Sequence, residues 1–184
     1  MKHYLLFTGH MIDKDGRSEK RFPQDKEISA KEKIKQVLVD ISATIHGPFA
    51  GIAGGACGGD ILFHECCAEL GIPSKMYLAL PPNEFKITSV SFAGKDWSER
   101  FDSLIHQLPV VVLPDNVYAG EGYNIWQRAN LWMLDAALQN GRVNMTLIVL
   151  WDGSPSNAEG GAAHMVEIAK LQRLTIAHIN TALL

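Results

Sequence analysis

The sequence predicts an α/β protein with a Rossmann-like, doubly wound fold, in which helices cover both faces of a mainly parallel sheet of about six strands. Short apolar segments alternate with longer segments in which apolar residues recur at helical spacing. Strands that are apolar on both sides are typical of a parallel sheet buried between two layers of helices, which makes three layers in all. The chain has 184 residues, of which 47% are hydrophobic and 20% charged, so we expect one domain over residues 1–184.

Strands and helices are expected to alternate along the whole chain. In the first helix, Ile34, Leu38 and Ile41 share one face, and Ser29 with Glu32 three residues later fits a capping box. The expected strands are YLLFT (4–8), FAGIAG (49–54), KMYLAL (75–80), PVVVLP (109–114), MTLIVLW (145–151) and TIAHI (175–179). The expected helices are 29–45, 59–70, 96–107, 124–140 and 161–172.

Glycines and prolines mark the ends of several of these elements. Gly71 and Gly141 directly follow two of the predicted helices, at the position where glycine commonly ends a helix. Pro81 and Pro82 end the third strand, and prolines stand at both ends of the fourth. These boundaries agree with the alternation of short strands and helices.

Charge and hydropathy exclude several classes of protein. The formal net charge is -3, so no general attraction to nucleic acid or to a membrane surface is expected. The longest apolar runs are too short to cross a bilayer, and the N-terminal segment is read as a first strand rather than a signal peptide. The three cysteines, Cys57, Cys66 and Cys67, include an adjacent pair and make a poor disulfide framework. We therefore expect a cytoplasmic protein with no nucleic-acid or membrane partner.

The end of the first strand is a candidate part of a binding site, because parallel sheets bind ligands at the carboxyl ends of their strands. Gly9 allows a tight turn there, while Thr8 and His10 supply polar atoms. We expect these three residues to line the floor of the site. The alternative is an ordinary turn at the end of a strand.

A glycine cluster, GGACGGD (54–60), follows the second strand. Glycines let backbone N–H groups approach a phosphate, and the N-terminus of the following helix favours negative charge. The spacing matches neither G-x-G-x-x-G nor the Walker pattern, and no lysine is present to meet a phosphate. We expect contacts with a phosphate or a ribose, with Asp60 directed to a ribose hydroxyl or a backbone donor; the alternative is a tight turn in which Asp60 caps the helix. The expected ligand-binding residues here are Gly54, Gly55, Gly58, Gly59 and Asp60.

A second glycine pair, Gly160 and Gly161, follows the fifth strand and opens another helix. We expect both glycines to contact the same ligand. Asp152 and Glu159 flank the connecting loop, and Glu167 lies two turns into the helix. The alternative is a surface loop that ends in a helix cap.

Other chemistry near the glycine cluster has weaker support. A zinc site would need Cys57, His64, Cys66 and Cys67, but these contain no C-x-x-C pair, so we expect no metal and no cofactor. Cys57 at a helix N-terminus is a candidate nucleophile, but no recognisable pattern places a base beside it. Asp60 and His64 are four residues apart, and we favour a pair on the helix surface over a proton-transfer pair.

Two groups of large side chains suggest further contacts. The helix at 124–140 has more large apolar residues than one buried face requires, which favours a homodimer. The WSERF segment (97–101) either clamps a base by stacking or packs a loop onto the core. The residues concerned are Trp126, Trp132 and Met133 in the helix, and Trp97, Arg100 and Phe101 in the segment.

Three motifs resemble the SLOG superfamily of Rossmann-like domains, which includes the LOG-type phosphoribohydrolases. GGACG (54–58) keeps a G-G-x-x-G pattern, with Ala53 where the enzymes have a further glycine. GGAAHMVE (160–167) keeps a glycine pair and a final glutamate, while Ala163 and His164 replace a glycine and a threonine. QRAN (127–130) is similar to the arginine-bearing helix of the enzymes. The resemblance implies Arg128 and Glu167 as catalytic residues in hydrolysis of the N-glycosidic bond of a nucleoside monophosphate.

A second branch of the same superfamily has a G-G-A-x-G-A-D pattern, which GGACGGD resembles. TGHMID, RFP, GGDILFHE and WSERF resemble SLOG-type domains found beside bacterial signalling modules. This resemblance implies binding of a nucleotide-like small molecule, with a role in signalling. Our leading expectation is therefore a binding module for a nucleotide-derived ligand. The phosphoribohydrolase is the alternative, and a scaffold without a ligand is the third.

Overall fold

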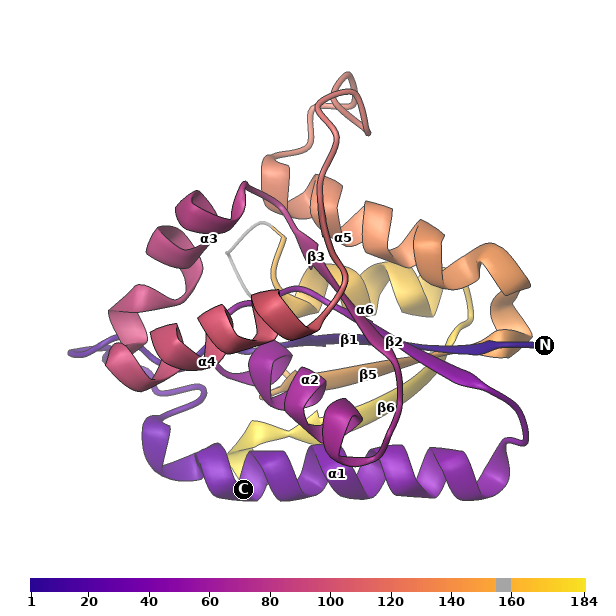
Figure 1. The fold of residues 1–184 in the computed structure, drawn as a ribbon, viewed down its shortest axis with the longest axis horizontal. Helices are drawn as coiled ribbons and strands as arrows, with labels where there is room; N and C mark the ends of the chain where they lie inside the picture. The colour runs from indigo at the N-terminus through magenta and orange to yellow at the C-terminus, as the bar shows by residue number, and fades with distance from the viewer. Residues whose placement is uncertain (155–159) are drawn as a thin grey trace.

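Six strands form one all-parallel sheet in the computed structural model, which describes residues 1–154 and 160–184 (Figure 1). The strand order is β4-β3-β2-β1-β5-β6, and each neighbouring pair is parallel. The predicted Rossmann-like α/β fold is thereby confirmed. The strands are β1 (His3–Gly9), β2 (Phe49–Ala53), β3 (Ser74–Leu78), β4 (Val110–Val112), β5 (Met145–Trp151) and β6 (Thr175–Asn180).

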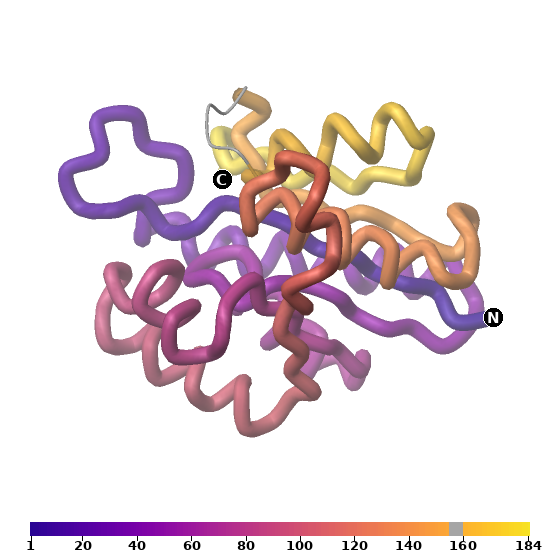
Figure 2. Tube along the Cα trace, turned by 90° about the horizontal axis from the view of Figure 1, so that it is seen from above, coloured from indigo at the N-terminus to yellow at the C-terminus, as the bar shows by residue number. Residues whose placement is uncertain are grey.

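Helices cover both faces of the sheet (Figure 1). α1, α2 and α4 lie on one face; α5 and α6 lie side by side on the other, and α3 stands at the carboxyl ends of the strands (Figure 2). None of the helices in the described residues combines the length and apolarity needed to span a membrane. The helices are α1 (Glu27–Thr44), α2 (Gly59–Glu69), α3 (Pro82–Ser89), α4 (Lys95–Gln107), α5 (Ile125–Ala137) and α6 (Ala162–Leu171).

The central strand β1 shows why the sheet is buried on both faces. Alternate side chains of a strand point to opposite faces. Phe7 stacks on Phe63 of α2 with ring centroids 4.9 Å apart, whereas Leu6 belongs to a separate core cluster with Met133 of α5 and Met165 of α6. The continuous apolar sequence of the strand therefore supplies two cores at once.

Three helices differ from the sequence prediction, at the start of α1, at the cap of α5 and in the presence of α3. α1 begins at Glu27, after a 3-10 turn at Gln24–Lys26, so Ser29 lies inside the helix and the predicted capping box there is wrong. A capping box is instead present at α5. The side-chain oxygen of Asn124 accepts from backbone N–H groups, and the side-chain oxygen of Gln127 accepts the backbone N–H of Asn124. The helix α3 was not predicted, because Pro81 and Pro82 were read only as the end of a strand.

The chain reverses its direction of winding at β1. β2, β3 and β4 are added on one side of this strand, and β5 and β6 on the other. The segments that follow β1 and β5 consequently diverge from the middle of the carboxyl edge, which is where such sheets form ligand crevices. Figure 2 shows the segment after β1 projecting away from the sheet.

Candidate functional site

A cleft of about 380 Å³ opens at the carboxyl ends of β1, β2 and β3. α3 forms one wall, and α5 with the start of α6 forms the other. This volume is within the usual range for small-molecule sites. The lining residues are Phe7, Thr8, Gly9, Met11, Gly54, Ala56, Asp60, Tyr77, Ala79, Phe85, Thr88, Ser89, Trp126, Ala129, Asn130, Met133, Gly160, Gly161 and Ala162.

The end of β1 forms part of the cleft. Thr8 and Gly9 line it. A Cβ atom on Gly9 would lie 2.9 Å from Cβ of Leu150 on the paired strand, so a larger residue would force β1 and β5 apart. Glycine is therefore required here by sheet packing, independently of any ligand.

Asp60 is the acidic group of the cleft. Its side chain stands in the first turn of α2, and Oδ2 accepts the N–H of Ala56 at 3.2 Å. A Cβ atom on Gly54 would lie only 2.6 Å from the same oxygen, so Gly54 makes room for the carboxylate. Burial raises the pKa of Asp60 to about 7, against the opposing effect of the Ala56 N–H. Asp60 thus binds a backbone donor of the glycine turn while also lining the cleft, but it does not cap α2, whose N-cap is Gly58 without a side-chain bond.

His64 binds the glycine turn from the core side, through the carbonyl of Gly54. The ring is fully buried, with Nε2 at 2.9 Å from the Gly54 carbonyl and Nδ1 at 2.9 Å from Oγ of Ser74. A carbonyl only accepts, so Nε2 carries the proton and Nδ1 accepts from the Ser74 hydroxyl. Burial lowers the pKa of His64 to about 4, which keeps the ring neutral. The expected surface pair of Asp60 and His64 is therefore wrong: His64 faces inward and positions Gly54.

The remaining glycines of the cluster are packed against protein and do not line the cleft. Gly58 has φ of 100°, and a Cβ atom there would lie 2.8 Å from the backbone nitrogen of Ile12. Gly55 and Gly59 are buried against aromatic and aliphatic side chains of the core. Close packing of the turn accounts for these three glycines.

Three backbone N–H groups of the glycine turn already have acceptors within the chain. Ala56 donates to Asp60, Cys57 donates to the Ser89 carbonyl at 3.0 Å, and Gly59 donates to the His10 carbonyl at 3.1 Å. A phosphate bound through these three groups would have to displace their bonds beside an acidic side chain.

His10 lies beside the cleft rather than in its lining. Its Nε2 is 3.1 Å from Oδ1 of Asp152, and the Asp152 N–H points to the same nitrogen at 3.3 Å. Burial lowers the pKa of His10, although the hydrogen bond with the Asp152 side chain and its charge act in the opposite direction. The pair joins the segments that follow β1 and β5.

The second glycine pair, Gly160 and Gly161, lines the cleft. Gly160 has φ of 86°, and a Cβ atom there would lie 2.5 Å from Cβ of Trp126. Its carbonyl accepts from Nδ2 of Asn130 at 2.7 Å. These contacts seat the start of α6, with Gly161 as its N-cap, against the first turns of α5. Glu159, which was expected to flank this loop, lies outside the described residues.

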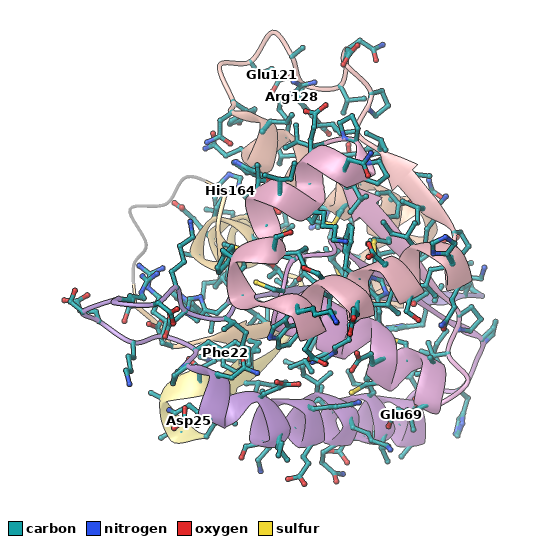
Figure 3. All side chains as sticks on the ribbon, turned by 60° about the vertical axis from the view of Figure 1, so that its left-hand side comes forward. Phe22, Asp25, Glu69, Glu121, Arg128 and His164 are labelled. Carbon is teal, nitrogen blue, oxygen red and sulfur yellow. The ribbon has the colours of Figure 1, made fainter. Side chains whose placement is uncertain are left out.

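The two residues expected to be catalytic do not line the cleft. Glu167 is exposed on α6. Arg128 donates to the carbonyls of Pro114, Asp115 and Val117 at 3.2, 2.7 and 2.8 Å. Its guanidinium therefore holds the loop that leads from β4 into α5. Figure 3 labels Arg128 together with Glu121, which lies in this loop.

The wall formed by α3 was missed by the sequence prediction. Phe85, Thr88 and Ser89 of this helix line the cleft, and the Phe85 ring meets Trp126 of α5 edge to face at 6.0 Å. The available signal was Pro82, because proline is common in the first turn of a helix. Asn130, a buried polar residue on α5, was also missed.

The large apolar residues of α5 are accounted for within the chain. Trp126 lines the cleft, Trp132 meets Tyr77 edge to face at 4.6 Å, and Met133 is buried in the core. The excess of apolar residues on which the predicted homodimer rested is therefore explained without a partner.

WSERF packs a helix onto the core, which was one of its two predicted roles. Trp97 and Phe101 are buried, and the Arg100 guanidinium lies 4.0 Å from the centre of the Trp97 ring. Arg100 also binds Glu65 through two nitrogens at 2.7 and 2.9 Å, and Glu27 at 2.6 Å. The cleft lining does not include Trp97, Arg100 or Phe101.

The cysteines provide neither a metal site nor a reactive thiol. All three are buried and free, and burial raises the pKa of Cys57 to about 12, so its thiolate is not available near neutral pH. Within residues 1–154 and 160–184, no group of three or more His, Cys, Asp and Glu side chains is arranged to hold a metal ion.

No protein-family model, curated protein or solved structure matches the chain. The resemblance to the SLOG superfamily accordingly stays an expectation from short motifs. The fold and the cleft are the observations from which a function has to be argued.

Proposed function

We propose that the chain binds a nucleotide or a nucleotide-derived ligand in this cleft. The observation that carries the proposal is convergence: Thr8, Gly9, Gly54, Asp60, Gly160 and Gly161, six of the predicted ligand-binding residues, come from three separate segments and line one cavity. That cavity lies at the carboxyl edge where the winding reverses, the usual position of ligands in such sheets.

The lining suits a ligand with a flat heteroaromatic part. Tyr77, Phe85 and Trp126 present aromatic rings, and a few polar groups stand among them. Stacking of a base on an aromatic side chain contributes about 1–3 kcal/mol. A mostly apolar cavity with a few placed polar groups is typical of small-molecule sites.

The proposed role is binding, with a signalling function for the occupied state, rather than hydrolysis. A phosphoribohydrolase needs its catalytic groups at the substrate, whereas Glu167 is exposed on α6 and Arg128 is bonded to the loop after β4. A cytoplasmic location is part of the proposal, because three buried, unpaired cysteines suit a reducing compartment.

The test is a thermal-shift screen of nucleosides, nucleotides and ADP-ribose against the wild type, Trp126→Leu and Trp132→Leu. The two tryptophans lie on the same helix, but only Trp126 lines the cleft. A ligand that binds only the native state at about 100 times its Kd adds about 2.7 kcal/mol of stability, which is about 5–10 °C in Tm for a chain of this size.

We expect a ligand shift in the wild type and in Trp132→Leu, and its loss in Trp126→Leu. If no compound shifts the wild type, the chain does not bind this class of ligand. A shift that survives unchanged in Trp126→Leu would place binding outside the cleft.

A further inference from the structure

The cleft carries negative but no positive charge. Asp60 is its acid, and the described residues that line it include no lysine, arginine or histidine. Arg128, the cation expected at the site, is bonded to backbone carbonyls outside the lining. A phosphate carries up to two negative charges and would lie beside a carboxylate with no cationic side chain in the lining to offset it, which is unfavourable in a partly buried site.

The polar groups of the cleft include both acceptors and donors. An ionised Asp60 can only accept. One N–H of the Asn130 amide donates to the Gly160 carbonyl at 2.7 Å, and its amide oxygen is an acceptor. The hydroxyl of Thr88 donates back into its own helix, to the carbonyls of Glu84 and Phe85 at 3.0 and 3.1 Å. The indole N–H of Trp126 and the hydroxyl of Tyr77, which also line the cleft, can donate. A ligand that brings N–H donors would pair with the acceptors, of which Asp60 is the charged one.

Aromatic rings, an acid and acceptor groups together select one part of a nucleotide. A base with an exocyclic amine supplies both a flat ring to stack and N–H groups to donate. We propose that the cleft binds an amine-bearing nucleobase beside Asp60, and that a phosphate on the same ligand lies outside the lined volume. This inference rests on the proposed function and deepens it by naming the part of the ligand that is recognised.

The test compares matched ligands by isothermal titration near pH 8, where Asp60 is ionised. Adenosine is paired with purine riboside, cytidine with uridine, and guanosine with inosine, because each pair differs at an exocyclic amine. Each amine-bearing nucleoside is also compared with its 5′-monophosphate. The protein variants are Asp60→Asn, which keeps size and an acceptor for the Ala56 N–H, and Asp152→Asn, an acid of the same sheet edge outside the lining.

We expect at least one amine-bearing nucleoside to bind the wild type about tenfold or more tightly than its partner, and its 5′-phosphate to change Kd by less than about threefold. Asp60→Asn should weaken the nucleoside and its monophosphate alike by about tenfold. Asp152→Asn should leave both values within about twofold.

Three results would overturn the inference while leaving ligand binding intact. These are equal binding of both members of every pair, a gain of more than about tenfold from the 5′-phosphate, or stronger binding of the monophosphate by Asp60→Asn. The ligand pairs decide the question in the wild type even if Asp60→Asn fails to fold. Absence of binding by every compound would instead overturn the proposed function itself.

Discussion

Asp60 and His64 stand one helical turn apart on α2, and burial acts on them in opposite senses. In the folded protein, burial raises the pKa of Asp60 from its ordinary value of 3.8 to about 7. Burial lowers the pKa of His64 from its ordinary value of 6.5 to about 4. Each group stays mainly uncharged over much of the range in which it would be charged in the unfolded chain.

The pH dependence of stability follows from these directions. Between about pH 4 and 7 the folded state binds the Asp60 proton more strongly than the unfolded state, so this group lowers the free energy of unfolding as pH rises. His64 binds fewer protons in the folded state between about pH 4 and 6.5, so it raises the free energy of unfolding as pH rises. The two contributions oppose each other.

We predict that Asp60→Asn gains stability relative to the wild type as pH rises from about 4.5 to 7.5, by about 1 kcal/mol or more. Urea unfolding at several pH values measures the difference. Glu99→Gln is the control, because this carboxylate belongs to an exposed pair with Lys95 on α4, away from the cleft. A difference between Asp60→Asn and the wild type that does not change with pH would contradict the assignment.

At the scale of elements, Arg100 of α4 connects two other helices on the same face of the sheet. Its guanidinium binds Glu65 of α2 in a bidentate pair and Glu27 of α1, while it also stacks on Trp97. The side chain is 18% exposed, so these bonds are partly shielded from water. Arg100 and the carboxylates stabilise each other's charged forms, which lowers the pKa of Glu65 despite its burial.

We predict that Arg100→Lys lowers the free energy of unfolding by about 1–3 kcal/mol, because lysine keeps the charge but cannot form the planar bidentate pair. Lys95→Ala removes an exposed ion pair with Glu99 on the same helix and should change stability by less than about 0.5 kcal/mol. Urea unfolding of both variants provides the measurement. Equal effects would show that the network is no stronger than a surface pair.

For the whole molecule, the order of the strands decides which predicted residues meet. β1 has β2 on one side and β5 on the other, so the turns after β1 and β2 and the start of α6 converge. The same winding puts Glu167 on the outer part of α6, away from the cleft lining. Glu167 belongs to the same sequence motif as Gly160 and Gly161, but only the two glycines line the cleft.

We predict that Glu167→Ala leaves the ligand-induced shift in Tm unchanged within about 1 °C, because the removed carboxylate does not line the cleft. We also expect no release of free base when AMP or other nucleoside monophosphates are incubated with the wild type. Thermal shift and chromatography of the reaction mixture measure the two effects. Base release that depends on Glu167 would support the phosphoribohydrolase instead.

The alternation of elements was predictable from the sequence because it depends on local periodicity. The all-apolar segments became buried parallel strands, and the glycine loops were correctly placed at the carboxyl edge. Thr8, Gly54, Asp60 and Gly160 were predicted to bind a ligand, which stays a prediction; the structure shows that they line one cleft. Each of these inferences needs only residue type, spacing and the general geometry of a parallel sheet.

Tertiary structure alone decided what each of these residues does. Gly58 and Gly59 have the composition of a phosphate loop, but the neighbouring backbone and core occupy the space around them. His64 became a buried support, and α3 supplied a wall that only its position across from α5 reveals. The reason is physical: a glycine, an acid or a histidine has the same local signal whether its neighbour is a ligand or another part of the chain. Only the packing of distant segments determines which neighbour is present.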